Sequence, residues 1–119
     1  MELNEQLAQA MGTVLPGAVW LVVCDQKPLP DEYIVVTTVD ERPEIYSGDQ
    51  DEQLAGAYRA AWYSRAGTAG KADKMRRAAR AAGFLVESTP PAGYDSTTGY
   101  YITYIEVSNT DTCEDYQIT

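Results

Sequence analysis

The order in which strand-forming and helix-forming segments follow one another is the strongest constraint on this fold. Three strand-like segments, at residues 18–23, 33–40 and 54–65, stand between two helix-like ones. A doubly wound parallel sheet would need strands that alternate with helices, and this order excludes it. The full order, α-β-β-β-α-β-β, predicts a single α+β domain. Its sheet is expected to be mostly antiparallel or mixed, with two helices packed on one face.

Two amphipathic helices are predicted from the spacing of apolar residues. Leu3, Leu7 and Met11 recur at intervals of four, which indicates a helix at about residues 3–12. A second helix is expected at about residues 70–82. Its apolar stripe consists of Ala72, Met75, Ala79 and Ala82. This stripe would let the helix lie close to a sheet.

Five strands are predicted from runs of β-branched and aromatic residues, at 18–23, 33–40, 54–65, 84–89 and 99–107. The segment ERPEIYSGDQDEQ (41–53) holds acids, a proline and a glycine, so it is predicted to be a long loop between two strands. The segment YDSTTG (94–99) is predicted to be a turn. Asp95 can accept hydrogen bonds from amides two residues further on, and Gly99 can adopt a positive φ.

The length of 119 residues suits one domain, assigned to residues 1–107, followed by a polar acidic tail at 108–119. No segment approaches the roughly 18 apolar residues of a membrane span, so no membrane partner is expected. The N-terminus has neither the basic nor the apolar part of a secretory signal, which favours the cytoplasm. Cys24 and Cys113 are then expected to be free thiols.

The charge is distributed unevenly along the chain. The net charge is −9, but residues 59–80 carry seven of the nine basic residues and one acid, so this segment is +6 and the remainder −15. The overall charge argues against binding a phosphate backbone. Two readings of the basic segment stay open: a solvated helix, or one face of a molecule whose opposite charges steer association between copies.

Catalytic and metal-binding signatures are not found in the sequence. It contains no histidine, no nucleophile motif of the Gly-x-Ser-x-Gly type and no cysteine pair at zinc-site spacing. The acids of GDQDE (48–52) do not follow a calcium-loop pattern and are expected to be solvated. The chain is therefore predicted not to be an enzyme and to have no cofactor.

The segment YDSTTGYYITYIEV (94–107) contains four of the nine tyrosines. It has no Lys or Arg, which argues against stacking of nucleic-acid bases. Alternation places Tyr100, Ile102 and Tyr104 on one face and Tyr101, Thr103 and Ile105 on the other. A strand that is apolar on both faces needs cover on both, so we expect helices on one side and another subunit on the other. Tyr101 and Tyr104 are the candidates for this subunit contact.

Together these segments resemble the tail terminator (tail completion) proteins of long-tailed bacteriophages and prophages. The resemblance covers about residues 3–107 and rests on the order of elements and on loosely spaced residues. Its parts are the Leu-spaced first helix, the proline loop PLPDEYIVV, the acidic ERPEIYSGDQDEQ, the helix KADKMRRAARAAGF and the closing YDSTTGYYITYIEV.

The resemblance implies a homo-oligomeric ring, expected to be a hexamer, at the neck end of the virion tail, assembled in the host cytoplasm. The ring would cap the tail tube, end tail polymerisation and provide the head-tail joining surface. Its partners would be the tail-tube protein and a head-completion or connector protein, and DNA would pass through without specific binding.

Two sets of residues are placed by analogy. Arg76, Arg77 and Arg80 are expected near a neighbouring subunit or the tube. An acidic set is expected at the lumen or the tube-facing surface: Asp40, Glu41, Glu44, Asp49, Asp51 and Glu52.

Two alternatives remain from the sequence. One is another neck component, such as a head-closure protein. The other is an acidic DNA mimic that inhibits a host restriction or defence nuclease, which is suggested by the −9 charge and the small size. Such mimics spread carboxylates along a surface, whereas this chain gathers positive charge around its second helix.

Overall fold

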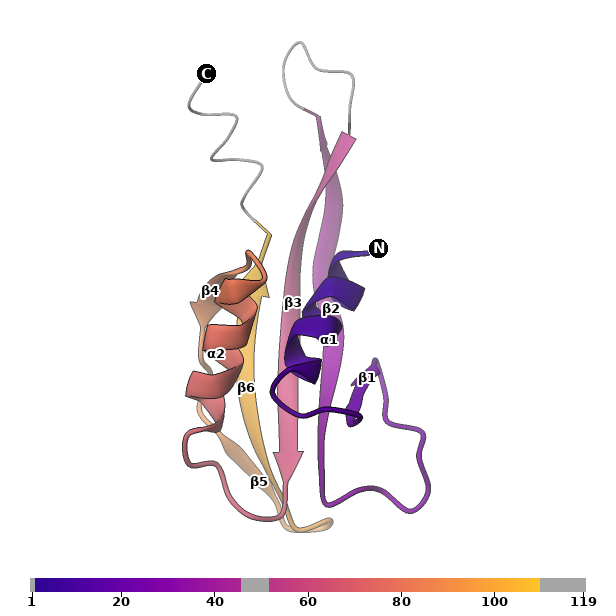
Figure 1. Cartoon of the computed structure of the whole chain (residues 1–119), viewed down its shortest axis with the longest axis vertical. Coiled ribbons are helices and arrows are strands. Elements are labelled where there is room, and N and C mark those ends of the chain that lie inside the picture. The colour runs from indigo at the N-terminus through magenta and orange to yellow at the C-terminus, as the bar shows by residue number, and fades with distance from the viewer. Residues whose placement is uncertain (1, 46–51, 110–119) are drawn as a thin grey trace.

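The computed structural model describes residues 2–45 and 52–109, and within these ranges the side chains of 2–39 and 56–109. Its elements are α1 (Leu3–Gly12), β1 (Val19–Leu21), β2 (Glu32–Ile45), β3 (Glu52–Ser64), α2 (Lys71–Ala81), β4 (Leu85–Ser88), β5 (Gly93–Asp95) and β6 (Tyr100–Ser108). In this part of the chain the strands form one mixed sheet in the order β1-β2-β3-β6-β4, with β5 beside β6 (Figure 1). The predicted α+β class is confirmed.

The two helices lie side by side on one face of the sheet (Figure 1). Both begin and end within one residue of the sequence prediction. Helix α1 contacts β1 and β2, whereas α2 contacts β6 and β4. In the first turn of α1 the backbone N–H of Glu2 donates to Oε1 of Glu5 at 3.0 Å, which satisfies a donor that the helix leaves free. Each helix therefore covers a different half of the sheet.

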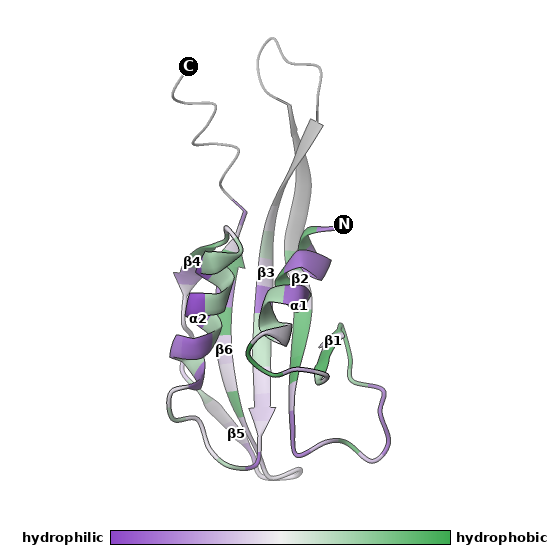
Figure 2. Ribbon diagram, viewed as in Figure 1, coloured by the Kyte–Doolittle hydropathy of each residue, from purple (hydrophilic) through white to green (hydrophobic). Residues whose placement is uncertain are grey.

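The main core lies between the helices and the sheet, where Figure 2 shows hydrophobic residues on the strands behind the helices. Every second residue of each strand faces this core, because successive side chains of a strand point to opposite faces of the sheet. From the strands these are Ile34, Val36, Tyr58, Ala60, Trp62, Ile105 and Val107. The helices contribute Leu7, Ala10, Met11, Met75 and Ala79. Of the stripe predicted for the second helix, Met75 and Ala79 are buried against the sheet and Ala72 is half-buried, whereas Ala82 is exposed and follows the end of α2.

The prediction of a loop at residues 41–53 is wrong. Strand β2 continues to Ile45, β3 resumes at Glu52, and the two strands stay paired from Glu41–Gly56 to Ile45–Glu52. A strand of a two-stranded ribbon need not alternate apolar and polar residues, and an edge strand tolerates proline. For these reasons the acidic, proline-containing sequence resembled a loop. Residues 46–51 lie outside the described residues.

Two smaller differences concern the strands at the edges. The strand predicted at 18–23 is confined to Val19–Leu21, because Val22 has φ +71° and turns the chain away from the sheet. The short strand β5 was not predicted and pairs with the first residues of β6. The turn that follows it is confirmed: the N–H of Thr97 donates to Oδ1 of Asp95 at 2.9 Å, and Gly99 has φ +81°.

Gly56 gives a direct test of the core. The fully buried Tyr58 ring lies over it, so a Cβ at position 56 would come within 2.6 Å of Cζ of Tyr58. We expect Gly56→Ala to lower the free energy of unfolding by about 1–3 kcal/mol, measured by urea denaturation, because Tyr58 must shift in a close-packed core.

Gly12→Ala is the matched control. Gly12 is the last residue of α1, and a Cβ there would meet no atom within 4 Å. Alanine has a higher helix propensity than glycine, so this variant should be neutral or more stable by up to about 1 kcal/mol. Equal losses in both variants would contradict the packing of Tyr58 over Gly56.

Candidate assembly surface

The sheet face opposite the helices carries a compact aromatic cluster. The rings of Tyr33 and Tyr63 stack with centroids 4.7 Å apart, and Tyr100 meets both of them edge-on at 5.4 and 6.0 Å. Trp20 adds an edge contact to Tyr33 at 6.3 Å. These rings come from four different strands and fix the strands to one another on the side that no helix covers.

The segment between β1 and β2 covers part of this cluster. The hydroxyl of Tyr100 donates to the carbonyl oxygen of Pro30, and Cys24 is buried against the rings. The guanidinium of Arg65 lies 4.5 Å from the centre of the Tyr100 ring and bonds Asp31 at 2.9 Å. Tyr100 is therefore a core residue, and the open part of this face lies further along β6.

The two tyrosines predicted to make a subunit contact lie on opposite faces of the sheet. Tyr104 is half-buried on the open face, with the guanidinium of Arg59 5.8 Å from its ring centre. Arg59 also forms an ion pair with Glu106, and its hydrogen bonds lower the pKa of that carboxyl. Tyr101 lies on the other face, exposed, with its ring centroid 4.7 Å from that of Tyr94. The predicted alternation along β6 is confirmed, but the two side chains do not share one surface.

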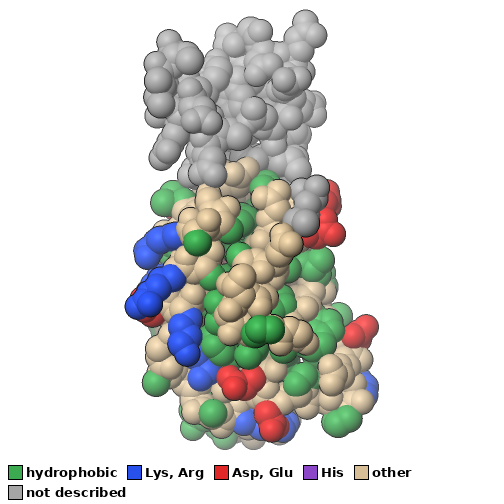
Figure 3. Space-filling view, in the orientation of Figure 1, with side chains coloured by type: hydrophobic (Ala, Val, Ile, Leu, Met, Phe, Trp, Pro, Cys, Tyr) green, Lys and Arg blue, Asp and Glu red, His purple; other side chains and the backbone are tan. Residues whose placement is uncertain are grey.

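The basic residues of α2 have different surroundings. Arg76 and Arg77 both pair with Asp73, and Arg76 also donates to the hydroxyl of Thr89 at 3.0 Å. Arg80 is exposed and has no ion-pair partner among the described residues. Figure 3 shows Lys and Arg side chains along this flank of the molecule.

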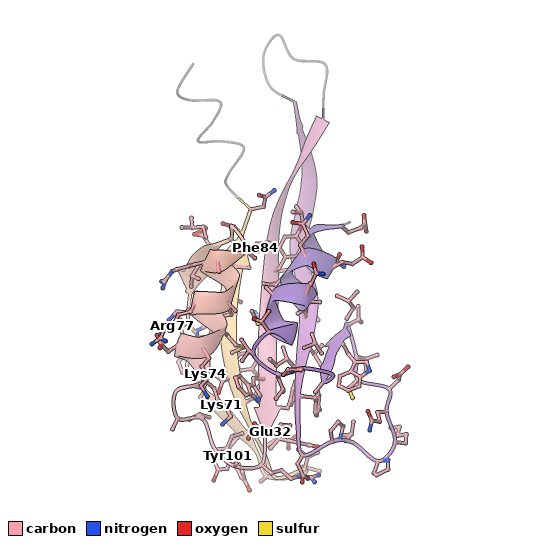
Figure 4. All side chains as sticks on the ribbon, viewed as in Figure 1. Glu32, Lys71, Lys74, Arg77, Phe84 and Tyr101 are labelled. Carbon is pink, nitrogen blue, oxygen red and sulfur yellow. The ribbon has the colours of Figure 1, made fainter. Side chains whose placement is uncertain are left out.

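Lys74 is also exposed and unpaired within the described part of the chain, and it comes from α2 as Arg77 does (Figure 4). Both side chains line an open groove of about 460 Å³ between the two helices. The groove is completed by Thr13, Val14 and Ala78. This flank of α2 therefore offers positive charge to an anionic partner.

Lys71 differs from the other basic residues of α2. Its side chain is 13 % exposed, and its Nζ lies 3.9 Å from Oε1 of Glu32 and 5.2 Å from the ring centre of Trp62. Nε1 of Trp62 donates to the same carboxylate oxygen at 3.1 Å. Lys71 thus ties the start of α2 to the sheet and is not part of the outward-facing charge.

Three of the six predicted acidic residues lie in a projecting hairpin that we call the arm, residues 41–45 and 52–56. Glu41 and Glu44 lie in β2, Glu52 lies in β3, and Asp40 stands at the base of the arm. Asp49 and Asp51 lie outside the described residues. Within the described chain no further strand pairs with the arm, which extends beyond the helices (Figure 1).

Sequence reasoning missed a set of exposed apolar side chains. Among the residues whose side chains are described, four of the large exposed hydrophobic ones lie at the β1 edge of the sheet, and three lie beside β6 at the opposite edge. The first group, which we call the valine edge, consists of Leu21, Val22, Val23 and Val39. At the opposite edge, Leu85 lies beside Ser108, whereas Tyr94 lies beside Tyr101, seven positions earlier on β6 and on the other face of the sheet. These three side chains do not form one surface. An apolar run such as AVWLVV predicts a buried strand, and only the turn at Val22 shows that its last residues face outward.

The backbone at Val22 is strained. Its φ of +71° is unfavourable for a β-branched residue, and the N–H of Val23 donates to the carbonyl of Leu21 at 2.8 Å across it. Together these features describe a γ-turn of the rare, strained form. Such a conformation costs on the order of 1–3 kcal/mol. Here it holds a side chain that is 70 % exposed, so burial within the described chain does not offset the strain.

Comparison with protein-family models and with curated proteins gave no match to this sequence. Across residues 2–45 and 52–109, no helix is long and apolar enough to cross a membrane. In the same residues, no three Cys, Asp or Glu side chains are grouped in a way that could hold a metal ion.

The aromatic cluster predicts a loss of stability at alkaline pH. Burial, and then the neighbouring Tyr63 and Tyr100, raise the pKa of Tyr33 from 10.0 to about 12. The folded state therefore favours the neutral phenol. This contribution to stability is complete below pH 10 and is lost as the pH rises from 10.0 towards 12. Tyr33→Phe cannot ionise, so its free energy of unfolding should fall less steeply over this range. Equally steep curves for both proteins, measured by urea denaturation, would contradict the burial of this hydroxyl.

Proposed function

We propose that this chain is a structural assembly protein of the tail-terminator type. Copies form a ring, a hexamer by analogy, at the neck end of a phage tail. The ring caps the tail tube, ends its polymerisation and offers a joining surface to the head. The chain acts by binding other proteins and not by catalysis.

The arm is the observation that carries this proposal. It extends for five residue pairs, Glu41–Gly56 to Ile45–Glu52, which is about 17 Å at about 3.4 Å per residue. A two-stranded ribbon is only marginally stable by itself in water. Packing against another protein surface would therefore stabilise the arm. A tube end or a neighbouring subunit is a surface of this kind.

The distribution of charge and apolar surface supports the same reading. Positive charge is concentrated on α2, while the arm and its base are acidic. Ile102 and Tyr104 are only half-buried on the sheet face that no helix covers. A single copy of the chain leaves these surfaces to solvent, whereas an assembly can bury them.

The arm also suits the acidic channel that the resemblance implies. Carboxylates that face a lumen repel the phosphate backbone, so DNA slides through without binding. In this arrangement the arm lies towards the lumen or the tube, and α2 lies towards a neighbouring subunit or ring.

The first test is the assembly state of the purified full-length chain. We expect light scattering after gel filtration to give a mass near six times 13.1 kDa, and negative-stain images to show rings with a central hole. A strictly monomeric protein over the whole concentration range would overturn the ring.

The second test separates a terminator from another neck component. The tail-tube protein of the same genome is polymerised with and without this chain, and tube lengths are measured in negative-stain images. We expect the chain to bind one end of each tube and to shorten the tubes in proportion to its concentration. Rings that bind a head connector and leave tube growth unchanged would indicate a head-closure protein.

The DNA-mimic alternative fits the structure less well, because the exposed flank of α2 would meet the basic DNA-binding surface of a nuclease with like charge. It makes a separate prediction. Salt-sensitive displacement of DNA from a restriction nuclease by the purified chain would support it, and would count against the ring-forming role.

A further inference from the structure

We propose that the acidic C-terminal segment of this chain, residues 110–119, binds along α2 and in the groove between α1 and α2 of the same copy. The segment reads TDTCEDYQIT and contains three acids and no basic residue. It lies outside the described residues. Three features of the described chain lead to this inference: the chemistry of the groove, a row of cations that leads to it, and the place where β6 ends.

The groove combines positive charge with apolar surface. Lys74 and Arg77 supply the positive charge, and none of the residues that line the groove is acidic. Val14 and Ala78 supply the apolar surface. The volume of about 460 Å³ is in the range of ligand sites. The groove therefore suits an anionic segment that also carries apolar side chains.

The C-terminal segment has the complementary chemistry. Glu114 and Asp115 place two carboxylates side by side in the sequence, and these can form charge-assisted hydrogen bonds with ammonium and guanidinium groups. Tyr116 and Ile118 follow as its large apolar residues. Their side chains can bury the apolar surface of the groove while the carboxylates meet its cations.

A row of cations connects the groove with the end of α2. Lys74, Arg77 and Arg80 are exposed and follow one another at intervals of three, so consecutive members are neighbours on the helix surface. The row is about 9 Å long at about 1.5 Å per residue. The acids of the segment, from Asp111 to Asp115, span about 13 Å in an extended chain. The two rows of opposite charge therefore match in length.

The described chain ends beside the last turn of α2. Leu85 comes soon after that turn and pairs with Ser108, the last residue of β6 (Figure 1). From this end of the molecule, Lys74 lies about 10 Å back along the axis of α2. Residues 110–115 cover up to about 20 Å when extended. The segment can therefore reach the whole row within its own copy.

The other basic residues are poorer partners. Of those outside the row whose side chains are described, four already pair with a carboxylate: Arg59, Arg65, Lys71 and Arg76. Lys27 lies between β1 and β2, at the opposite edge of the sheet from β4. Within the row, Arg77 pairs with Asp73, but its side chain remains 76 % exposed and can accept a second carboxylate.

Acids near the end of β6 disfavour other routes for the segment. Glu87 accepts a hydrogen bond from the hydroxyl of Ser108 at 3.0 Å on the β4 side. Glu2 and Glu5 stand at the start of α1, at the same end of the helix layer (Figure 1). Like charges repel the segment from β4 and from the start of α1. The row on α2 lies between these two acidic places.

The short connection to β6 favours binding within one copy. Exposed ion pairs are individually weak. A short tether, however, holds the acids at an effective concentration in the millimolar range. Several weak pairs are then sufficient, whereas the same contact with a second copy at about micromolar protein would stay largely unoccupied.

The first experiment measures the order of residues 110–119 in the full-length chain by amide heteronuclear NOE. We expect values close to those of β6 at low salt. They should fall in about 1 M salt, where charges further apart than about 3 Å are screened. They should not change on dilution. Low values at low salt would overturn the proposal, and values that fall on dilution would show that the segment binds another copy.

The second experiment exchanges charges. One variant carries Lys74→Glu and Arg77→Glu, and the other carries Glu114→Lys and Asp115→Lys. The ratio of bound to free segment should fall about tenfold or more in each variant. The chain with all four changes should regain the wild-type NOE values.

Lys27→Glu is the control, because it makes the same change of charge at an exposed position beyond the reach of the segment. It should leave the NOE values unchanged. Urea denaturation should show the same free energy of unfolding for all these variants, since Lys74 and Arg77 are exposed. Failure of the fourfold variant to restore order would overturn the pairing of the segment with α2.

Cys113 provides a test of position. The other cysteine, Cys24, is buried, so a cysteine introduced at the surface pairs with Cys113 under mild oxidation. Leu85 is exposed and lies next to Ser108, on the sheet face opposite the helices, so an unbound segment would reach Leu85→Cys more readily than Ala78→Cys. We expect the reverse: the disulfide with Ala78→Cys should form about tenfold faster. A faster reaction at position 85 would contradict binding in the groove.

A bound segment covers the flank of α2 that the proposed function assigns to a neighbouring subunit or ring. This consequence rests on the proposed function: rings should form faster when Glu114→Gln and Asp115→Asn release the segment. Unchanged assembly of that variant would remove α2 from the ring contact and keep the binding of the segment. A monomeric wild type with an ordered segment would overturn the ring alone.

Discussion

The antiparallel pairing of β3 with β2 and β6 is the interaction on which the rest of the structure depends. Its register puts Tyr58, Ala60 and Trp62 under the helices and turns the residues between them to the other face. A slip by one residue would exchange the two faces, placing Arg59 in the main core and exposing Trp62. The aromatic cluster and the tie between Lys71 and the sheet both depend on this register.

Much of this arrangement follows from the sequence. Helices with apolar residues three and four apart, and a β6 segment that alternates, indicate which faces are buried. The length of the β2–β3 hairpin could not be predicted in this way, because residues 41–45 hold two acids, an arginine and a proline and show no alternation of apolar residues. Alternating apolar residues indicate which side chains of a strand are buried, and not which backbone groups are hydrogen-bonded. A two-stranded ribbon can therefore form without such alternation.

The candidate surface was predictable in part. The concentration of positive charge on residues 59–80 is visible in the sequence, and so is the i,i+4 spacing of Asp73 and Arg77, but the pairing of Lys71 with Glu32 is visible only in three dimensions. The exposure of the valine edge depends on the positive φ of Val22. This backbone angle cannot be read from a continuous run of apolar residues. These exposed residues therefore resembled core residues in the sequence.

Strand β1 accompanies β2 only from Ile34 to Val36, so the rest of that edge of β2 has no strand beside it in the described chain. An open edge of this length invites uncontrolled strand addition and aggregation. The acidic residues and Pro43 of the arm discourage the addition of further strands at this edge. The composition that makes this segment resemble a loop thus also protects it, because charges and a proline on an open edge discourage amyloid-like stacking of copies.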